Sequence, residues 1–350
     1  MAQEWESSDY RDTLEDLNRQ IEQNPERLDL YYQRSELLYA LEDYEAGIKD
    51  LDSIVRQNPQ DALAYTFRAY GYGKLEQYLA AVNDYSRGIE LCPNYAKAYY
   101  NRATVYQRLE QWDKALVDFD LAIRLEPNYT DAYYNRGIVH NRLNREQDAI
   151  ADYSQVIKLQ PQDEAAYYNR GNTYNRLKQY PQAIDDYDRA IALNPEDLEA
   201  YYSRANVYHK TRVYPRAIAD YTHIIKNNPR HAPTYYNRGT THLGAMNLTQ
   251  AIADFTQAIS LNPNYAEAYY NRAVTHNKMR EFLKAIADHQ KAIKLKPNYA
   301  EAYGNLGLVY QTTGDKQRAI ANLTKAAELF QAQSNLPLYQ YVETKLRALK

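Results

Sequence analysis

Nine prolines, each 34 residues after the one before, constrain the fold of this chain more than any other feature. They are Pro25, Pro59, Pro93, Pro127, Pro161, Pro195, Pro229, Pro263 and Pro297. The segment at residues 132–137 also recurs in near-identical form at 166–171 and 268–273. A repeat of this length predicts a stacked array, in which neighbouring repeats bury one continuous core. We therefore expect a single elongated domain.

Counting from Leu28 places the periodic proline at position 32 of each repeat. Nine repeats follow, at residues 28–61, 62–95, 96–129, 130–163, 164–197, 198–231, 232–265, 266–299 and 300–333. In each repeat, two segments with apolar residues at helical spacing flank a polar break near positions 14 to 17. Pro181 and Pro215 at position 18 suit the first turn of a helix, and the position-32 proline ends that helix. Each repeat is thus predicted to be a helix A, a turn and a helix B.

Two further helices are expected to cap the ends of the array. Residues 1–27 comprise a tail and a half-repeat helix with Leu14, Leu17 and Ile21 on its apolar side. Gln331 takes the place of the periodic proline, and residues 334–350 then carry a last amphipathic helix. Terminal repeats need such caps because their outer apolar edge has no neighbour.

The residues at fixed positions resemble those of the tetratricopeptide repeat (TPR) family. Position 4 is tyrosine in all nine repeats, position 8 is Ser, Ala or Gly, and position 20 is Gly or Ala. Small residues on facing helices allow close packing, and aromatic side chains fill the next layer. Position 7 departs from the family's usual leucine, because eight repeats have arginine there, as in the Tyr-Asn-Arg arrays of bacterial repeat proteins. The resemblance implies an all-α, right-handed superhelical α-solenoid of nine 34-residue helix-turn-helix repeats.

Composition argues against several functional classes. The net charge of −3 gives no bulk attraction to nucleic acid or to an anionic membrane. No apolar run approaches the ~20 residues of a membrane span, and residues 1–6 do not form a signal-peptide pattern, so we expect a cytoplasmic protein. We find no phosphate-binding glycine loop, nucleophile motif or zinc-binding cysteine set, and therefore expect no enzyme and no cofactor. His140, His242 and His276 share the aromatic packing position 11, one or more repeats apart, and are predicted to be core residues and not metal ligands.

Helical periodicity divides helix A into two arcs. Positions 4, 7, 8, 11 and 14 form the packing arc. Positions 2, 5, 6, 9, 12 and 13 form the opposite arc, here named the helix-A face. In proteins that resemble this chain, that arc lines the concave groove that receives partners. We therefore look for binding residues on the helix-A face.

Asparagine dominates the centre of the helix-A face. Position 6 holds Asn101, Asn135, Asn169, Asn237, Asn271 and Asn305, and position 9 holds Asn172 and Asn206. An amide both donates and accepts hydrogen bonds, which suits the main chain of an extended peptide. The alternative is that these amides bond to the backbone of their own array.

Basic and aromatic side chains flank the asparagines. Position 13 holds Lys74, Arg108, Arg142, Arg176, Lys210 and Lys278, and position 5 holds Tyr100, Tyr134, Tyr168, Tyr202, Tyr236 and Tyr270. The basic stripe favours an acidic or carboxylate-bearing partner segment, although cations also compensate the dipole at a helix C-terminus. The tyrosines either clamp apolar side chains of a ligand or stack on the next repeat.

Two charges vary together along the array. Position 7 is arginine and position 23 is aspartate in the first eight repeats, from Arg34 and Asp50 to Arg272 and Asp288, whereas the ninth has Leu306 and Asn322. An unpaired guanidinium on the packing arc would be costly. We therefore predict a ladder of Arg–Asp ion pairs between helices that specifies their register and is not the ligand site.

The leading hypothesis is a non-catalytic protein–protein interaction scaffold whose groove binds one or more proteins or peptides. One alternative is a single-stranded RNA-binding repeat protein, which the acidic net charge disfavours. Another is a solenoid that assembles end to end, which polar capping helices would disfavour. The two-carboxylate clamp of chaperone-binding TPR proteins is not matched, because Tyr202, Glu267 and Asn271 occupy its basic positions.

Overall fold

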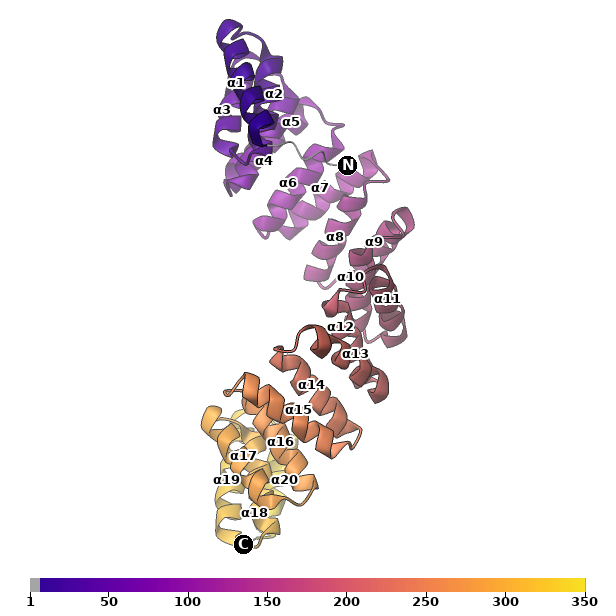
Figure 1. Cartoon of the computed structure of the whole chain (residues 1–350), viewed down its shortest axis with the longest axis vertical. Coiled ribbons are helices and arrows are strands. Elements are labelled where there is room, and N and C mark those ends of the chain that lie inside the picture. Colours follow the sequence, from indigo (N-terminus) through magenta and orange to yellow (C-terminus); the bar gives the residue numbers. More distant parts are fainter. Residues whose placement is uncertain (1–6, 350) are drawn as a thin grey trace. The chain divides into compact units, whose positions relative to one another are not determined.

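The computed structural model describes residues 7–349, and these form 20 α-helices without a strand. The chain divides into two compact units, Met1–Thr173 and Tyr174–Lys350. Within each unit, successive helices pack against one another in chain order (Figure 1). The all-α repeat architecture predicted from the proline spacing is confirmed.

Helix A of each repeat begins at position 1 and ends at position 13. These helices are α2 (Leu28–Ala40), α4 (Ala62–Lys74), α6 (Ala96–Arg108), α8 (Thr130–Arg142), α10 (Glu164–Arg176), α12 (Leu198–Lys210), α14 (Ala232–Gly244), α16 (Ala266–Lys278) and α18 (Ala300–Thr312).

Helix B begins at position 17 and ends two residues before the periodic proline. These helices are α3 (Tyr44–Gln57), α5 (Tyr78–Leu91), α7 (Trp112–Leu125), α9 (Glu146–Leu159), α11 (Tyr180–Leu193), α13 (Tyr214–Asn227), α15 (Leu248–Leu261) and α17 (Phe282–Leu295). The last, α19 (Lys316–Ala332), runs three residues longer. Gln331 in place of proline explains the extension, because glutamine can continue a helix and proline cannot.

The turn between helices A and B depends on one residue in the left-handed conformation. Position 15 has φ near +60° in eight repeats, for example 55° at Glu110, and 84° at Gly314 in the ninth. This conformation lets the backbone N–H of Gln111 reach back to the carbonyl of Tyr106 at 2.9 Å, which satisfies the end of α6. At the start of the next helix, Asp43 and Asp315 cap α3 and α19 through their carboxylates.

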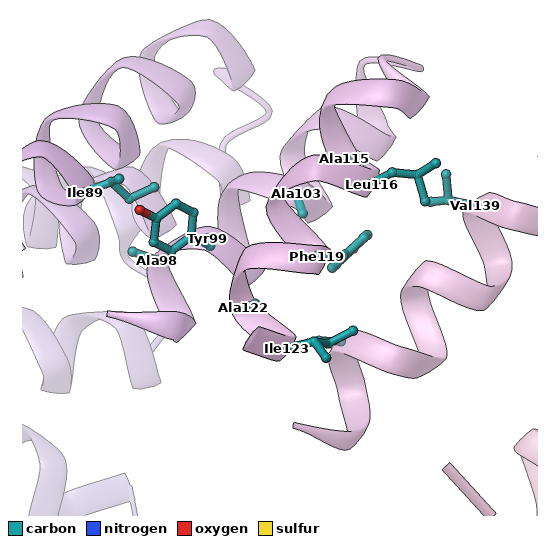
Figure 2. Packing of buried hydrophobic residues seen from close by; sticks show 11 residues of the cluster. Ile89, Ala98, Tyr99, Ala103, Ala115, Leu116, Phe119, Ala122, Ile123 and Val139 are labelled. Atoms are coloured by element: carbon teal, nitrogen blue, oxygen red, sulfur yellow. The ribbon is translucent and has the colours of Figure 1, made fainter. Parts of the chain in front are cut away.

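Small residues at position 8 bring the two helices of a repeat together over the aromatic ring at position 24. A Cβ added to Gly137 would lie 3.0 Å from the ring of Tyr153, and one added to Gly239 would lie 2.8 Å from the ring of Phe255. The core continues from repeat to repeat, as the cluster in Figure 2 shows. Phe119 of α7, fully buried, packs there with residues from α5, α6 and α8, including Ile89 and Val139.

Helices α1 (Ser7–Gln23) and α20 (Leu336–Arg347) lie beside the first and last repeats. Leu17 and Ile21 of α1 pack on Leu30. Val342 and Leu346 of α20 belong to a cluster with residues of α18 and α19. The tail expected at the N-terminus falls largely on residues 1–6, which lie outside the described residues.

The outer side of α20 is less polar than the sequence suggested. Leu336 is 60% exposed and Tyr341 is 49% exposed. At this end of the chain the cap is therefore not polar enough to disfavour end-to-end assembly.

The histidines lie in packed positions. The side chains of His140, His242 and His276 are 14%, 13% and 9% exposed, and each Nε2 lies 3.8 or 3.9 Å from the position-23 aspartate of its repeat. Among residues 7–349, no three His, Cys, Asp or Glu side chains are grouped so as to hold a metal ion.

His289 occupies the aromatic position 24 and is fully buried, with its ring centroid 5.7 Å from that of Tyr270. Neither of its ring nitrogens has a hydrogen-bond partner among the described residues. Burial lowers the pKa of His289 to about 4, because the charged form cannot be solvated there. His289 is therefore neutral in the folded protein at pH 7.

Deletion of residues 335–350 should destabilise the ninth repeat, because it uncovers Leu323 and Phe330, which α20 helps to bury. The loss of the Val342 and Leu346 contacts alone should remove about 1.5–3 kcal/mol per side chain. We expect lower helicity by circular dichroism and aggregation by sedimentation velocity. A truncated chain that stays monomeric and equally helical would show that α20 does not act as a cap.

Replacement of His289 by phenylalanine should make stability less dependent on pH between 6.5 and 4. The unfolded chain takes up a proton at His289 near pH 6.5, whereas the folded chain does so only near pH 4, so the free energy of unfolding falls as pH decreases through this window. The fall due to this residue is up to about 3 kcal/mol. Urea unfolding at pH 7 and pH 4.5 measures this fall in the free energy of unfolding. The proteins compared are the wild type, His289→Phe and the control His223→Phe. Equal pH dependence in all three would refute this account.

Candidate binding face

The tyrosines at position 5 are half-buried, and most are hydrogen-bonded to the asparagine at position 6 of the following repeat. The distances between Asn Nδ2 and the Tyr hydroxyl are 3.1 Å for Asn135 and Tyr100, 2.8 Å for Asn169 and Tyr134, 2.7 Å for Asn237 and Tyr202, 3.0 Å for Asn271 and Tyr236, and 2.9 Å for Asn305 and Tyr270. Burial raises the pKa of these five tyrosines, which keeps their hydroxyl groups protonated. Each pair therefore connects consecutive repeats on the helix-A face.

The tyrosine rings pack within their own repeat. The rings of Tyr100, Tyr236 and Tyr270 each lie 4.9 Å, between centroids, from the tyrosine at position 34. On another side, the Tyr100 ring lies 5.9 Å from that of Phe119 at position 24. The expected stacking on the next repeat is thus replaced by ring contacts inside the repeat and a hydroxyl contact to the next one. Tyr168 is also half-buried.

The asparagine amides are already oriented by the protein. Nδ2 of Asn135 donates to the carbonyl of Asp131 at 3.0 Å, and Nδ2 of Asn169 donates to that of Ala165 at 2.9 Å. A backbone carbonyl only accepts, so these contacts fix which amide atom is nitrogen. The NH₂ groups are used inside the array, and the amide oxygen is the remaining group. The predicted alternative, a bond to the backbone of the array, is what the structure shows for Asn135 and Asn169. Asn237, Asn271 and Asn305 bond to a tyrosine hydroxyl of the array, which the sequence did not predict.

The remaining asparagines have other surroundings. Asn101 interacts with the hydroxyl of Tyr85. Oδ1 of Asn206 accepts from the Tyr221 hydroxyl at 2.6 Å and from Asn237 Nδ2 at 3.4 Å. Asn172 is half-buried. None of these side chains extends freely from the surface.

The basic residues at position 13 are the exposed members of the candidate site. Arg108, Arg142, Arg176, Lys210 and Lys278 are the last residues of α6, α8, α10, α12 and α16, and all five are exposed. Because these residues lie at helix C-termini, their positive charges compensate the helix dipole, as the alternative interpretation predicted. Lys210 also donates to Asn175 Oδ1 at 3.2 Å. These cations nevertheless remain accessible to a ligand.

The arginines at position 7 do not belong to the binding face. In seven repeats this arginine donates two hydrogen bonds of 2.5–2.9 Å to the carboxylate at position 23 of its own repeat. The pairs are Arg34 with Asp50, Arg68 with Asp84, Arg102 with Asp118, Arg136 with Asp152, Arg204 with Asp220, Arg238 with Asp254, and Arg272 with Asp288. The predicted ladder of ion pairs is confirmed in these repeats.

A third contact of the same arginines was not foreseen. Nη1 donates to the side chain at position 25 of the preceding repeat, for example Arg68 to Asp52 at 2.7 Å and Arg102 to Ser86 at 2.9 Å. The sequence carries the signal, because position 25 is Asp, Ser or Thr in each of the first seven repeats. Each guanidinium therefore joins its own helix A to two helices B.

The ninth repeat replaces this polar contact by an apolar one. Leu306 is 3% exposed and belongs to a cluster with Tyr310 and Ala319. Gln290, at position 25 of the eighth repeat, donates to the hydroxyl of Tyr310 at 3.2 Å instead. The joint loss of arginine and aspartate in the sequence thus marks a change in how the last repeat packs.

Comparison with known protein families identifies the repeats. Models described as tetratricopeptide repeat match residues 4–62, 96–129, 130–163, 164–197, 266–299 and 290–321, and one described as TPR repeat matches 71–110 and 247–279. The chain belongs to the tetratricopeptide repeat family. No curated protein matches it in sequence.

Three solved structures are similar to this TPR protein, and one of them has a TM-score above 0.5. A tetratricopeptide repeat protein from Parabacteroides merdae is 20% identical, with a TM-score of 0.52 over 71% of this chain and 99% of that one. YrrB, described as a TPR protein with an unusual peptide-binding site, is 24% identical, with a TM-score of 0.48 over 53% and 95%. MamA is 26% identical, with a TM-score of 0.45 over 47% and 96%.

No helix within residues 7–349 has the length and apolar character needed to cross a membrane.

Replacement of Asp118 by alanine should destabilise the protein by about 3–5 kcal/mol, because it leaves the mostly buried guanidinium of Arg102 without its carboxylate. The side chains of Arg102 and Asp118 are only 16% and 3% exposed. The double variant Arg102→Leu/Asp118→Asn copies the ninth repeat and should lose less stability than Asp118→Ala alone. Denaturant unfolding followed by circular dichroism compares the two. If Asp118→Ala loses less than about 1 kcal/mol, the pair behaves as an exposed one.

Proposed function

We propose that this TPR protein is a non-catalytic interaction scaffold that binds an extended, acidic or carboxylate-bearing segment of a partner protein along its helix-A face. The observation that supports the proposal is the exposed cation at the end of helix A in successive repeats, including Arg108, Arg142 and Lys210. A cation that recurs in repeats two to six and in repeat eight matches a ligand whose carboxylates recur along its chain. Arginine adds bidentate recognition of carboxylates.

The asparagine amides of the same face supply a second kind of contact to the partner segment. With the NH₂ groups of Asn135 and Asn169 used inside the array, their Oδ1 atoms can accept hydrogen bonds from the main-chain N–H groups of an extended segment. Such contacts do not depend on the sequence of the segment. Selectivity for the sequence of the partner segment then comes from the cations at position 13 and from any local hollow of the helix-A face.

The packing of the face supports a rigid receptor. Tyrosine hydroxyls, asparagine amides and ring contacts hold the helix-A face in place before a partner binds, so little ordering is needed on binding. The same packing argues against single-stranded RNA, because the tyrosine rings lie against position-34 and position-24 rings and are not open platforms for base stacking.

The double variant Arg108→Glu/Arg142→Glu should abolish capture of the partner without unfolding the protein. Both side chains are exposed, and exposed substitutions usually change stability by about 0.5 kcal/mol or less. Asn135 and Asn169 are less suitable for this test, because their removal also breaks contacts between repeats. The measurement is an affinity pull-down from a lysate with mass spectrometry, together with a melting curve.

The matched control is Arg124→Glu/Lys158→Glu, which makes the same change of charge at exposed positions of α7 and α9. This control should capture the partner as the wild type does. If both variants lose capture of the partner equally, the net charge of the protein, and not the helix-A face, accounts for the binding. Nuclease treatment that removes the captured material would favour the RNA alternative.

A further inference from the structure

The second repeat lacks the tyrosine that the other central repeats place at position 5. Thr66 stands there, whereas repeats one and three to eight have tyrosine. Thr66 is 3% exposed, and its hydroxyl donates to the carbonyl of Ala62 at 2.9 Å. The short threonine side chain stays against its own helix, so the space that a tyrosine ring takes in other repeats is not filled by the residue at position 5.

A hollow of about 300 Å³ lies at this place on the helix-A face. Its lining includes Thr66, Tyr39, Phe67, Tyr70 and Tyr95. Tyr70 is 42% exposed, and its ring lies 5.9 Å from that of Tyr39. The volume lies at the lower end of the range for small-molecule sites, about 300–1,000 Å³. It suits a single large side chain better than a cofactor.

Two residues around this hollow are those that hold a tyrosine in other repeats. Tyr95 is at position 34, equivalent to Tyr129, whose ring lies 4.9 Å from that of Tyr100. Asn101 is at position 6 of the next repeat, equivalent to Asn135, whose Nδ2 lies 3.1 Å from the Tyr100 hydroxyl.

Tyr236 has the same two contacts as Tyr100, one through its ring and one through its hydroxyl group. Its ring lies 4.9 Å from that of Tyr265 and its hydroxyl 3.0 Å from Asn271 Nδ2. The second repeat thus keeps the tyrosine at position 34 and the asparagine at position 6 of the next repeat, whose amide also interacts with the Tyr85 hydroxyl, and lacks the phenol.

We infer that this hollow, bounded by Thr66, Tyr95 and Asn101, receives a tyrosine side chain of the partner segment, which takes the place of the missing position-5 tyrosine. The inference rests on the proposed function and specifies one residue of the ligand. The ligand ring packs on Tyr95, and its hydroxyl group meets the Asn101 amide. Burial of the ring supplies most of the affinity.

Charges around the hollow indicate which residues flank that tyrosine. Lys97 lines it at position 2, where five other repeats have Asp or Glu. An adjoining hollow of about 390 Å³ shares Tyr70 and Asn101 with the first and adds Lys74 and Arg108. Glu36 and Glu76 also line the two hollows, so the cations exceed the anions by one. We therefore expect acidic residues next to the tyrosine of the ligand.

Fluorescence anisotropy with two labelled peptides tests the inference. The probes are Gly-Glu-Tyr-Glu-Gly and Gly-Glu-Ala-Glu-Gly, each with fluorescein at its N-terminus, titrated with the full chain at low salt. The tyrosine peptide should bind about tenfold or more tightly than the alanine peptide. Lys97→Glu should weaken both peptides and preserve their ratio.

Thr66→Tyr should remove the preference for tyrosine, because it restores the array's own side chain in the hollow. Its matched control is Thr240→Tyr, the same change at a half-buried position 9 of the helix-A face in the other unit, which should retain the preference. If circular dichroism shows that Thr66→Tyr does not fold, Asn101→Ala replaces it. That variant should reduce the preference by removing the contact to the hydroxyl.

Equal affinity of the two peptides for the wild type, or a preference that survives Thr66→Tyr, would overturn the inference. If Thr66→Tyr still captures a partner that Arg108→Glu/Arg142→Glu does not, the inference fails and the proposed function stands. If no variant and no wild-type chain captures a partner, the proposed function fails. The sequence Glu4-Trp5-Glu6 has similar chemistry. Markedly tighter peptide binding after deletion of residues 2–6 would assign the hollow to the chain's own segment and overturn the partner assignment.

Discussion

The contact on which the array depends most is the one made by the arginine at position 7. Its guanidinium is held by the carboxylate of its own helix B and by an Asp, Ser or Thr side chain of the preceding helix B. Arginine suits this place because its planar group offers several donors in fixed directions. A rotation of either helix by one residue would move an acceptor out of reach. The apolar core favours contact between the helices, and the guanidinium selects their register.

On the opposite side of helix A, the tyrosine and asparagine pairs connect the same repeats in the other direction along the chain. Tyr100 reaches forward to Asn135, 35 residues later, whereas Arg136 reaches back to Asp120, 16 residues earlier. The fourth repeat, for example, is joined to the third by polar contacts on both faces of helix A. The face proposed for binding gains its rigidity from side chains that look, in the sequence, like free ligand-binding groups.

Much of the fold could be predicted because it follows from strict periodicity. Helix A begins at Leu28 and Ala62 and at each later position 1, as the spacing of the prolines required. The Arg–Asp pairs followed from one comparison, since Leu306 and Asn322 replace both charges together. The surroundings of the asparagines could not be predicted, because a single helix shows which way Asn135 faces but not that Tyr100 of the previous repeat lies within reach. The hollow at Thr66 was missed for a related reason, since it arises from a side chain that is absent.

The fixed reach of these contacts also determines how such a chain can change its length. Arg272 donates to Thr256, and Arg238 donates to Thr222. Thr222 lies 34 residues before Thr256. If residues 232–265 were lost as a block, Arg272 would find Thr222 at the same offset, and Asn271 would find Tyr202 in place of Tyr236. Loss of a number of residues that is not a multiple of 34 would move both partners out of register. Duplication and loss of whole repeats are thus the changes of length that keep these contacts in register.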